Sequence, residues 1–330
     1  MMRLLGWLGS LRLTLAAFVF LGAGILIAYL NESHTSPWLV SSLVLLAVNL
    51  LAAILTRPYF RQQKPLLLFH LALLALILLI ALGRLTYLNG QAEVVQETEF
   101  AGDVLVTGEG VWHRRTLDKL RFINHGFSIA YGEGLYRLQT RNRVSWVDAA
   151  GQRHQDVIGD HVPLVLDGYR FYTTSNKGFA LIFDWLRPGQ PIIRGSINLP
   201  SYPVNSTGQA QQWVLPGMTE PVWVMLQLDE ELIKEDQPGE FRLPTNYRIV
   251  VRYLDQRYEL PDFSGRDLSP RQRSVELPGG RLVYAGMRSW MGYKVTYDPT
   301  LYWLLAVAVL AVLALGWHFW RKFNATPWNA

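Results

Sequence analysis

Four long runs of apolar residues dominate the hydrophobic pattern of the chain, three near its start and one near its end. They cover about residues 11–30, 38–56, 65–83 and 301–319. Each run is close to the roughly 20 residues that a helix needs to cross a hydrocarbon core about 30 Å thick. The first run is longer than the apolar core of a signal peptide and a second run follows at once, so we interpret it as a retained helix. The pattern predicts three transmembrane helices in residues 1–86 and a fourth in residues 300–330.

Residues 87–299 follow a different pattern, in which apolar and polar residues alternate over short segments that Gly, Pro, Asn and Asp interrupt. Residues 136–148 predict two strands with a turn at Asn142, and residues 280–297 predict two more that lead into the last helix. Residues 222–236 fit a helix, or a strand followed by a turn. Alternation with frequent turn signals is typical of an antiparallel sandwich or barrel. We therefore expect an integral membrane protein with four transmembrane α-helices and a large extracytoplasmic β-rich domain.

Basic residues flank the predicted helices unevenly. They precede the first helix, fill the loop between the second and third, and follow the fourth, whereas the loop at residues 31–37 has none. The residues concerned are Arg3, Arg12, Arg57, Arg61, Lys64, Arg321 and Lys322. Short basic loops remain in the cytoplasm. Both termini are therefore predicted to be cytoplasmic, with residues 87–299 on the periplasmic side.

Composition excludes several classes of protein. The net charge of +5 belongs partly to the loops just described, so it says little about a nucleic-acid partner, and a translocated domain would meet none. Membrane lipid is an expected partner, and nucleic acid is not. The chain has no cysteine, which excludes disulfides, thiol oxidoreductase chemistry and a C-x-x-C-H haem attachment site. Since G-x-S-x-G, H-E-x-x-H and P-loop motifs are also absent, no catalytic residue is predicted. The basic segment at residues 113–121 is interpreted as a solvated face, or a surface for an acidic partner.

His70 interrupts the third apolar run and is the main candidate for chemistry. A helix rises about 7–8 Å between Pro65 and His70, which places the imidazole in the cytoplasmic half of the bilayer. There it would be neutral, and a neutral imidazole nitrogen is a good iron ligand. Spacing alone leaves two interpretations open: a haem ligand, or a hydrogen bond to a neighbouring helix.

The other histidines are weaker candidates. His318 lies among Trp and Phe residues near the end of the last apolar run, a pattern typical of an interfacial anchor, although it could complete a bis-histidine haem site with His70. In that site Arg57, Arg61 and Lys64 would be candidates to pair with haem propionates. Four others are interpreted as ordinary surface or turn residues: His113, His125, His154 and His161.

Four stretches together resemble the ResB (CcsB) family of system II cytochrome c biogenesis. They are LGSLRLTLAAFVFLGAGIL, LLLFHLALLALILLIALGRLTYLNGQAEVVQETEF, GYRFYTTSNKGFALIFDW and WMGYKVTYDPTLYWLLAVAVLAVLALGW. They resemble, in turn, the opening helix, the third helix with its histidine, a strand pair in the middle of the domain, and the return to the membrane. Spread over most of the chain in this order, they are fairly specific to the family.

This resemblance implies a role in haem transport in the bacterial inner membrane. Members pair with a CcsA/ResC-like membrane protein, and together they carry haem b across the membrane and present it to apocytochrome c. The haem is held transiently and shared with the partner, and the family's third-helix histidine, which falls on His70, is one axial ligand. By the same resemblance, the chain is a non-catalytic subunit of a cytochrome c synthase (haem lyase) complex.

Some features depart from the family pattern. The chain is short for the family, the motif before the last helix reads Asp298-Pro299-Thr300 where a glycine is more usual, and the tryptophan-rich haem-presenting segment of the partner is absent. Two other functions stay open: a b-type electron-transfer subunit with His70 and His318 as ligands, and an anchored periplasmic binding or structural module.

Overall fold

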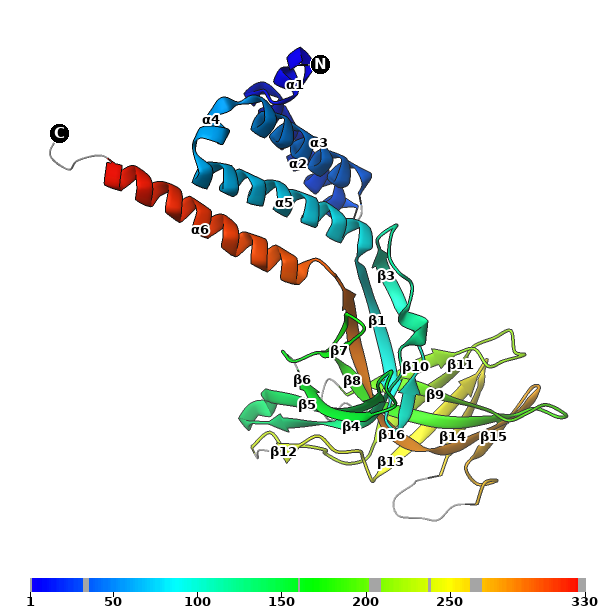
Figure 1. Ribbon diagram of the computed structural model, residues 1–330. Coiled ribbons are helices and arrows are strands. Elements are labelled where there is room, and N and C mark those ends of the chain that lie inside the picture. The colour runs from blue at the N-terminus through cyan, green and yellow to red at the C-terminus, as the bar shows by residue number, and fades with distance from the viewer. Residues whose placement is uncertain are drawn as a thin grey trace. The chain divides into compact units, whose positions relative to one another are not determined.

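The computed structural model describes residues 2–31, 36–159, 161–201, 209–236, 239–261 and 269–325 (Figure 1). The helices are α1 (Met2–Leu8), α2 (Leu11–Leu30), α3 (Pro37–Thr56), α4 (Pro58–Gln62), α5 (Lys64–Thr86) and α6 (Leu301–Ala325), with 3₁₀ turns η1 (Leu117–Lys119) and η2 (Glu133–Leu135). By its contacts the chain divides into two compact units. Met1–Gly90, Val106–Arg115 and Thr296–Ala330 form the helical unit; Gln91–Leu105 and Thr116–Val295 form the β-rich unit.

Four helices of the described chain are long and apolar enough to cross a membrane: Leu11–Leu30, Pro37–Thr56, Lys64–Thr86 and Leu301–Asn324. Their starts have local causes. The Ser10 hydroxyl accepts the backbone N–H of Leu13 at 3.3 Å, and Pro37 and Pro65 lie in first turns, where a missing N–H costs nothing. The predicted fold class, four spanning helices with a β-rich domain, is confirmed.

Small and polar residues join the first three helices. A Cβ on Gly9 would lie 2.7 Å from the backbone nitrogen of Ala53, so glycine permits close approach there. Asn49 of α3 is buried; it accepts the Thr14 hydroxyl at 2.8 Å and donates to the Leu8 carbonyl at 2.6 Å. Both polar groups of the Asn49 side chain therefore have hydrogen-bond partners, as burial in a membrane requires.

The described strands form three antiparallel sheets. The largest has the order β3-β1-β16-β8-β7, with β15 on β16 and β9 on β8; the others are β10-β11-β13-β14, and β12-β4-β5-β6 with β2 on β4. The strands are β1 (Leu88–Val95), β2 (Thr98–Phe100), β3 (Leu105–Glu109), β4 (Phe122–Tyr131), β5 (Arg137–Val147), β6 (Arg153–Gly159), β7 (Leu164–Leu166), β8 (Tyr169–Leu186), β9 (Ile193–Pro200), β10 (Gln209–Trp213), β11 (Val222–Leu228), β12 (Gly239–Glu240), β13 (Tyr247–Tyr253), β14 (Gln256–Leu260), β15 (Ser274–Leu277) and β16 (Gly280–Tyr297).

The main apolar core of the β-rich unit lies between the largest sheet and the β10-β11-β13-β14 sheet. Alternate residues of β8, β11 and β13 supply it, as the period of two requires. Its fully buried members include Phe179, Leu181, Phe183, Val222, Val224, Leu226, Ile249 and Val251. The third sheet packs on the first through a second group of rings, in which Phe122 contacts Phe171 and Tyr293 with centroids 5.2 and 5.5 Å apart.

Three predicted strand breaks are wrong. β5 runs through Asn142 without a turn and pairs with β4 and β6 on its two sides. Residues 280–297 form one strand, β16, in which Gly286 adopts φ 141°, a conformation open to glycine. The stretch 168–185, likened to a strand pair, is one strand, β8. The segment that fits either helix or strand begins as strand β11.

Candidate functional site

His70 lies on α5, six residues after the first residue of that helix, Lys64. At 1.5 Å per residue this is about 9 Å along the helix axis, inside the predicted span. Its side chain is half-buried, and aromatic rings flank it. The ring centroid of Phe60, from α4, lies 4.5 Å away and that of Phe69 lies 5.3 Å away.

One hydrogen bond defines the chemical form of this imidazole. Nδ1 of His70 lies 2.8 Å from the carbonyl oxygen of Leu66, one turn earlier in α5. A carbonyl oxygen only accepts, so Nδ1 carries the proton; in a neutral ring the lone pair then belongs to Nε2. Among the described residues Nε2 has no hydrogen-bond partner. The ring is thus oriented by its own helix and presents a nitrogen able to bind a metal.

His318 lies in a different environment. It is half-buried on α6 with the Phe319 ring 5.5 Å away, and it lines a pocket of about 290 Å³. The other lining residues come from α4, the start of α5 and the end of α6: Tyr59, Gln62, Gln63, Pro65, Arg321 and Lys322. His70 does not line this pocket, and no contact between the two histidines is found within the described part of the chain.

The candidate basic residues lie around α4. Arg57 ends α3 and caps α4, Lys64 begins α5, and both side chains are exposed. Arg61 lies in α4, but its side chain is outside the described residues. Arg57 and Lys64 therefore lie at the same end of α5 as His70. Neither forms an ion pair with another described residue.

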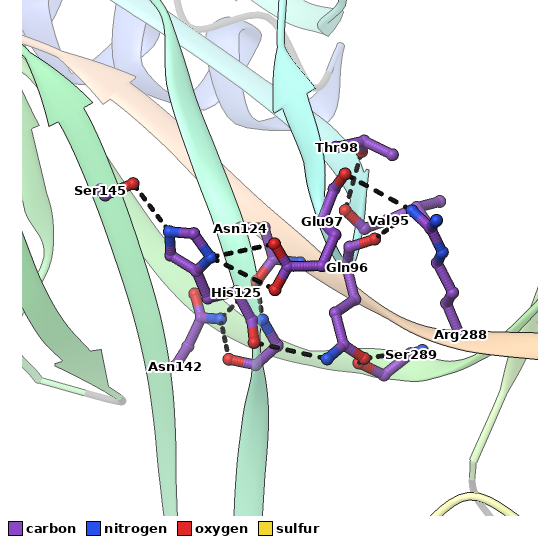
Figure 2. Close-up of polar contacts among 11 residues, drawn as sticks. Val95, Gln96, Glu97, Thr98, Asn124, His125, Asn142, Ser145, Arg288 and Ser289 are labelled. Atoms are coloured by element: carbon purple, nitrogen blue, oxygen red, sulfur yellow. Dashed lines mark hydrogen bonds and ion pairs between the residues drawn. The ribbon is translucent and has the colours of Figure 1, made fainter.

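His125 belongs to a polar network in the β-rich unit, which Figure 2 shows between Glu97 and Ser145. Nδ1 lies 3.2 Å from both carboxylate oxygens of Glu97, and Nε2 lies 2.7 Å from the Ser145 hydroxyl. Glu97 has φ 56° and Gly126 has φ 92°, so the backbone turns sharply on both sides of the pair. A cavity of about 520 Å³ adjoins it, lined by Glu97, His125, Arg143, Val144, Gln155, Asp156 and Val157.

The order hydroxyl, imidazole, carboxylate is the one that serine hydrolases use. Here Ser145 lies in the central strand of its sheet, with Ile123 and Gln155 as register partners on its two sides. The local backbone N–H groups are committed to strand pairing and do not form an oxyanion hole, which acyl transfer needs. The pairing of β4 with β5 shifts register between Asn124 and Phe127, which is a β-bulge in β4. We interpret the network as a support for this bulge.

Buried amides lie beneath this bulge. Asn142 Nδ2 donates to Asn124 Oδ1 at 2.7 Å and to the Gly126 carbonyl at 2.8 Å, and the Tyr293 hydroxyl donates to Asn142 Oδ1 at 2.6 Å (Figure 2 includes the two asparagines). Asn124 Nδ2 in turn donates to the Val94 carbonyl at 2.8 Å. The network therefore links strands β4 and β5 to strands β1 and β16 of the largest sheet.

A family model now identifies the chain. The model described as the ResB-like family matches residues 59–322, which is most of the chain. The chain belongs to the ResB-like family. This family is associated with cytochrome c biogenesis. A search of curated proteins found no match.

Among the described residues of this ResB-like chain, the other histidines have local partners or none that suggests a ligand set. His154 Nε2 donates to Asp148 at 2.7 Å, a hydrogen bond that lowers the pKa of that carboxyl, and its ring stacks on Trp146. His161 is exposed. No group of three or more His, Asp or Glu side chains able to hold a metal occurs in the described residues.

Two residues of the helical unit that the structure singles out were missed from the sequence. Asn49 carried a usable signal, because a polar residue inside an apolar run needs a partner. Phe60 carried none, since a phenylalanine in a short loop between spans is ordinary. Within the ResB-like match, α4 therefore acts as part of the wall of the His70 environment.

Proposed function

We propose that this chain is the ResB-like subunit of a system II cytochrome c maturation complex. With a CcsA/ResC-like membrane protein it would carry haem b across the membrane and present it for covalent attachment to apocytochrome c. The chain would contribute binding and orientation, while attachment itself would require the partner. In this proposal it is a non-catalytic subunit of a haem lyase complex.

The observation that supports this proposal most directly is the state of His70. Its Nδ1 proton is held by the Leu66 carbonyl 2.8 Å away, which directs the lone pair to Nε2. Haem iron takes such a nitrogen as an axial ligand, and a hydrogen bond on the other ring nitrogen raises its basicity. Because the described residues place no second histidine against it, we propose that the partner supplies the opposing ligand.

The proposed orientation in the membrane rests on charge. Lys and Arg concentrate around the start of α2, between α3 and α5, and near the end of α6. By the positive-inside rule these ends would face the cytoplasm, which puts the β-rich unit on the periplasmic side. His70, near the start of α5, would then lie on the side where haem made inside the cell enters. Arg57 and Lys64, at that same end, would be placed to pair with propionates.

The experiment measures haem in the purified chain, alone and co-purified with its CcsA/ResC-like partner. His70→Ala should lose most of the haem retained with the partner, and added imidazole should restore part of it. His318→Ala should leave haem content unchanged. The matched control exchanges two neighbours, Phe69→His with His70→Phe, which keeps composition and depth but turns the imidazole about 100° around the helix.

The outcomes separate the candidates. Haem retention and c-type cytochrome maturation in the His70→Ala strain would overturn the proposal. Haem in the isolated chain, lost equally in His70→Ala and His318→Ala, would instead indicate an electron-transfer subunit. Full function in the exchanged control would show that depth, and not the direction set by Leu66, is what matters.

A further inference from the structure

Residues 106–115 contain most of strand β3 and lie in the sequence between two segments of the β-rich unit, yet by their contacts they belong to the helical unit. Three hydrogen bonds attach this segment to the end of α5. The N–H of Gly110 donates to the Tyr87 carbonyl at 2.9 Å, and the N–H of Trp112 donates to the Leu85 carbonyl at 2.7 Å. His113 Nδ1 donates to the Thr86 carbonyl at 2.9 Å. They use carbonyls at a helix end, which have no partner within the helix.

Gly110 makes this attachment sterically possible. A Cβ at that position would lie 2.3 Å from the Leu85 carbonyl oxygen and 2.4 Å from its carbonyl carbon. Both neighbours are backbone atoms and cannot rotate away. His113 closes the other side: it is buried, and its ring lies 5.1 Å from that of Tyr297.

The outer side of the same segment is apolar and basic. Val111 is 76 % exposed and Trp112 is 63 % exposed. Arg114 is also exposed and has no ion-pair partner among the described residues, whereas Arg115 pairs with Glu109 at 2.7 Å. A large apolar pair held outward by backbone hydrogen bonds requires something to cover it.

The length of α5 gives the depth of this pair. The 23 residues of α5 span about 34 Å, slightly more than a hydrocarbon core, which predicts that Leu85, near its end, lies at the interface. The start of α6 is level with it, because a Cβ on Gly83 would lie 2.9 Å from the Thr300 hydroxyl. Trp303, three residues further, is 66 % exposed.

We propose that Val111, Trp112 and Arg114 form a lipid-binding surface that enters the membrane interface at the end of α5. Tryptophan prefers the headgroup level, where its ring is apolar and its N–H is wet, and Arg114 would pair with anionic phospholipid headgroups. Tyr302 and Trp303, at the start of α6, are exposed as well. A phospholipid fits this depth and composition better than a protein partner does.

The absence of cysteine allows a direct test with single nitroxide labels on the full chain in POPC:POPG (3:1) nanodiscs. Labels at Val111→Cys and Trp112→Cys should collide more with oxygen than with a water-soluble nickel complex, as should a reference label at Trp303→Cys. A label at Leu138→Cys, a position 60 % exposed on β5, should show the reverse.

Three further variants test how the segment is held at the end of α5 and how it binds headgroups. Gly110→Ala should shift the Trp112→Cys label to the water-like ratio and leave the Trp303→Cys label unchanged, whereas Gly132→Ala, with no atom closer than 3.8 Å, should shift neither. In pure POPC the Trp112→Cys label should move outward, and Arg114→Gln should abolish that dependence on POPG.

Three results would count against the proposal. A water-like ratio at both Val111→Cys and Trp112→Cys would overturn it. A label shielded from both reagents would mean that a protein surface, and not lipid, covers the segment. No response of the Trp112→Cys label to POPG would overturn the headgroup pairing of Arg114.

Discussion

The hydrogen bond from Tyr293 to Asn142 offers the sharpest test of how the β-rich unit is held together. The two side chains are buried, 1 % and 0 % exposed, and the oxygens lie 2.6 Å apart. Burial raises the pKa of Tyr293, so the hydroxyl stays protonated and remains a donor. Tyr293→Phe removes this one donor and little volume, leaving the Asn142 oxygen buried without it.

The size of the effect follows from the loss of this one hydrogen bond. One buried acceptor left without its donor costs about 1–3 kcal/mol, and a domain of 150–250 residues loses about 2–4 °C of midpoint per kcal/mol. Tyr293→Phe should therefore lower the unfolding midpoint by about 2–12 °C. Asn142→Leu also removes the bonds to Asn124 and Gly126, so its loss should be larger.

Thermal unfolding of the full chain in nanodiscs, followed by near-UV circular dichroism, measures these shifts. In the Asn142→Leu background the Tyr293 hydroxyl has lost its acceptor, so Tyr293→Phe should cost nothing there. The coupling between the two substitutions should then equal most of the single-variant loss. Tyr136→Phe, at a position 70 % exposed, is the control and should change nothing measurable. Equal losses from Tyr293→Phe in both backgrounds would refute the reasoning.

Two further predictions concern a carboxylate and a helix contact. Burial alone raises the pKa of Glu230, but hydrogen bonds from Arg242 and two backbone N–H groups outweigh it and lower the pKa to about 2, below the ordinary 4.5. Its stabilisation is therefore complete above pH 4.5 and is lost as the pH falls toward 2, so Glu230→Gln should flatten the midpoint-against-pH curve in that window; parallel curves would contradict this. In the membrane, Gly9→Ala should lower the midpoint because its Cβ would lie 2.7 Å from the Ala53 nitrogen, whereas Gly22→Ala, with no atom within 4 Å, should be neutral or stabilising; similar effects would contradict the contact.

The helices could be predicted from the sequence because their signals are local. An apolar run, a proline in the first turn and a serine cap lie within a few residues of the boundaries they define. The third helix still extends beyond its apolar run, to Thr86, since Arg84 and Thr86 continue the backbone hydrogen bonding despite their polarity. Hydropathy thus locates a span better than it locates its end.

The strand breaks were wrong for the opposite reason. Asn142 has the composition of a turn residue, but the Tyr293 hydroxyl that satisfies it comes from a strand 151 residues later. Nothing near Asn142 in the sequence indicates that donor. A buried asparagine is predicted as a turn residue when its hydrogen-bond partners are distant in the sequence. Asn142 can lie within a continuous strand because such distant partners satisfy its side chain.

The candidate site likewise has features set by nearby residues and features set by distant ones. The acceptor that orients His70 is local in the sequence, because the Leu66 carbonyl lies one turn earlier in the same helix. What surrounds the ring depends on packing, because Phe60 lies on a separate short helix with its ring centroid 4.5 Å from that of His70. Local sequence therefore determines which nitrogen is free, while non-local packing determines what that nitrogen can reach. A second ligand contributed by another protein, as we propose, would be a further step of the same kind.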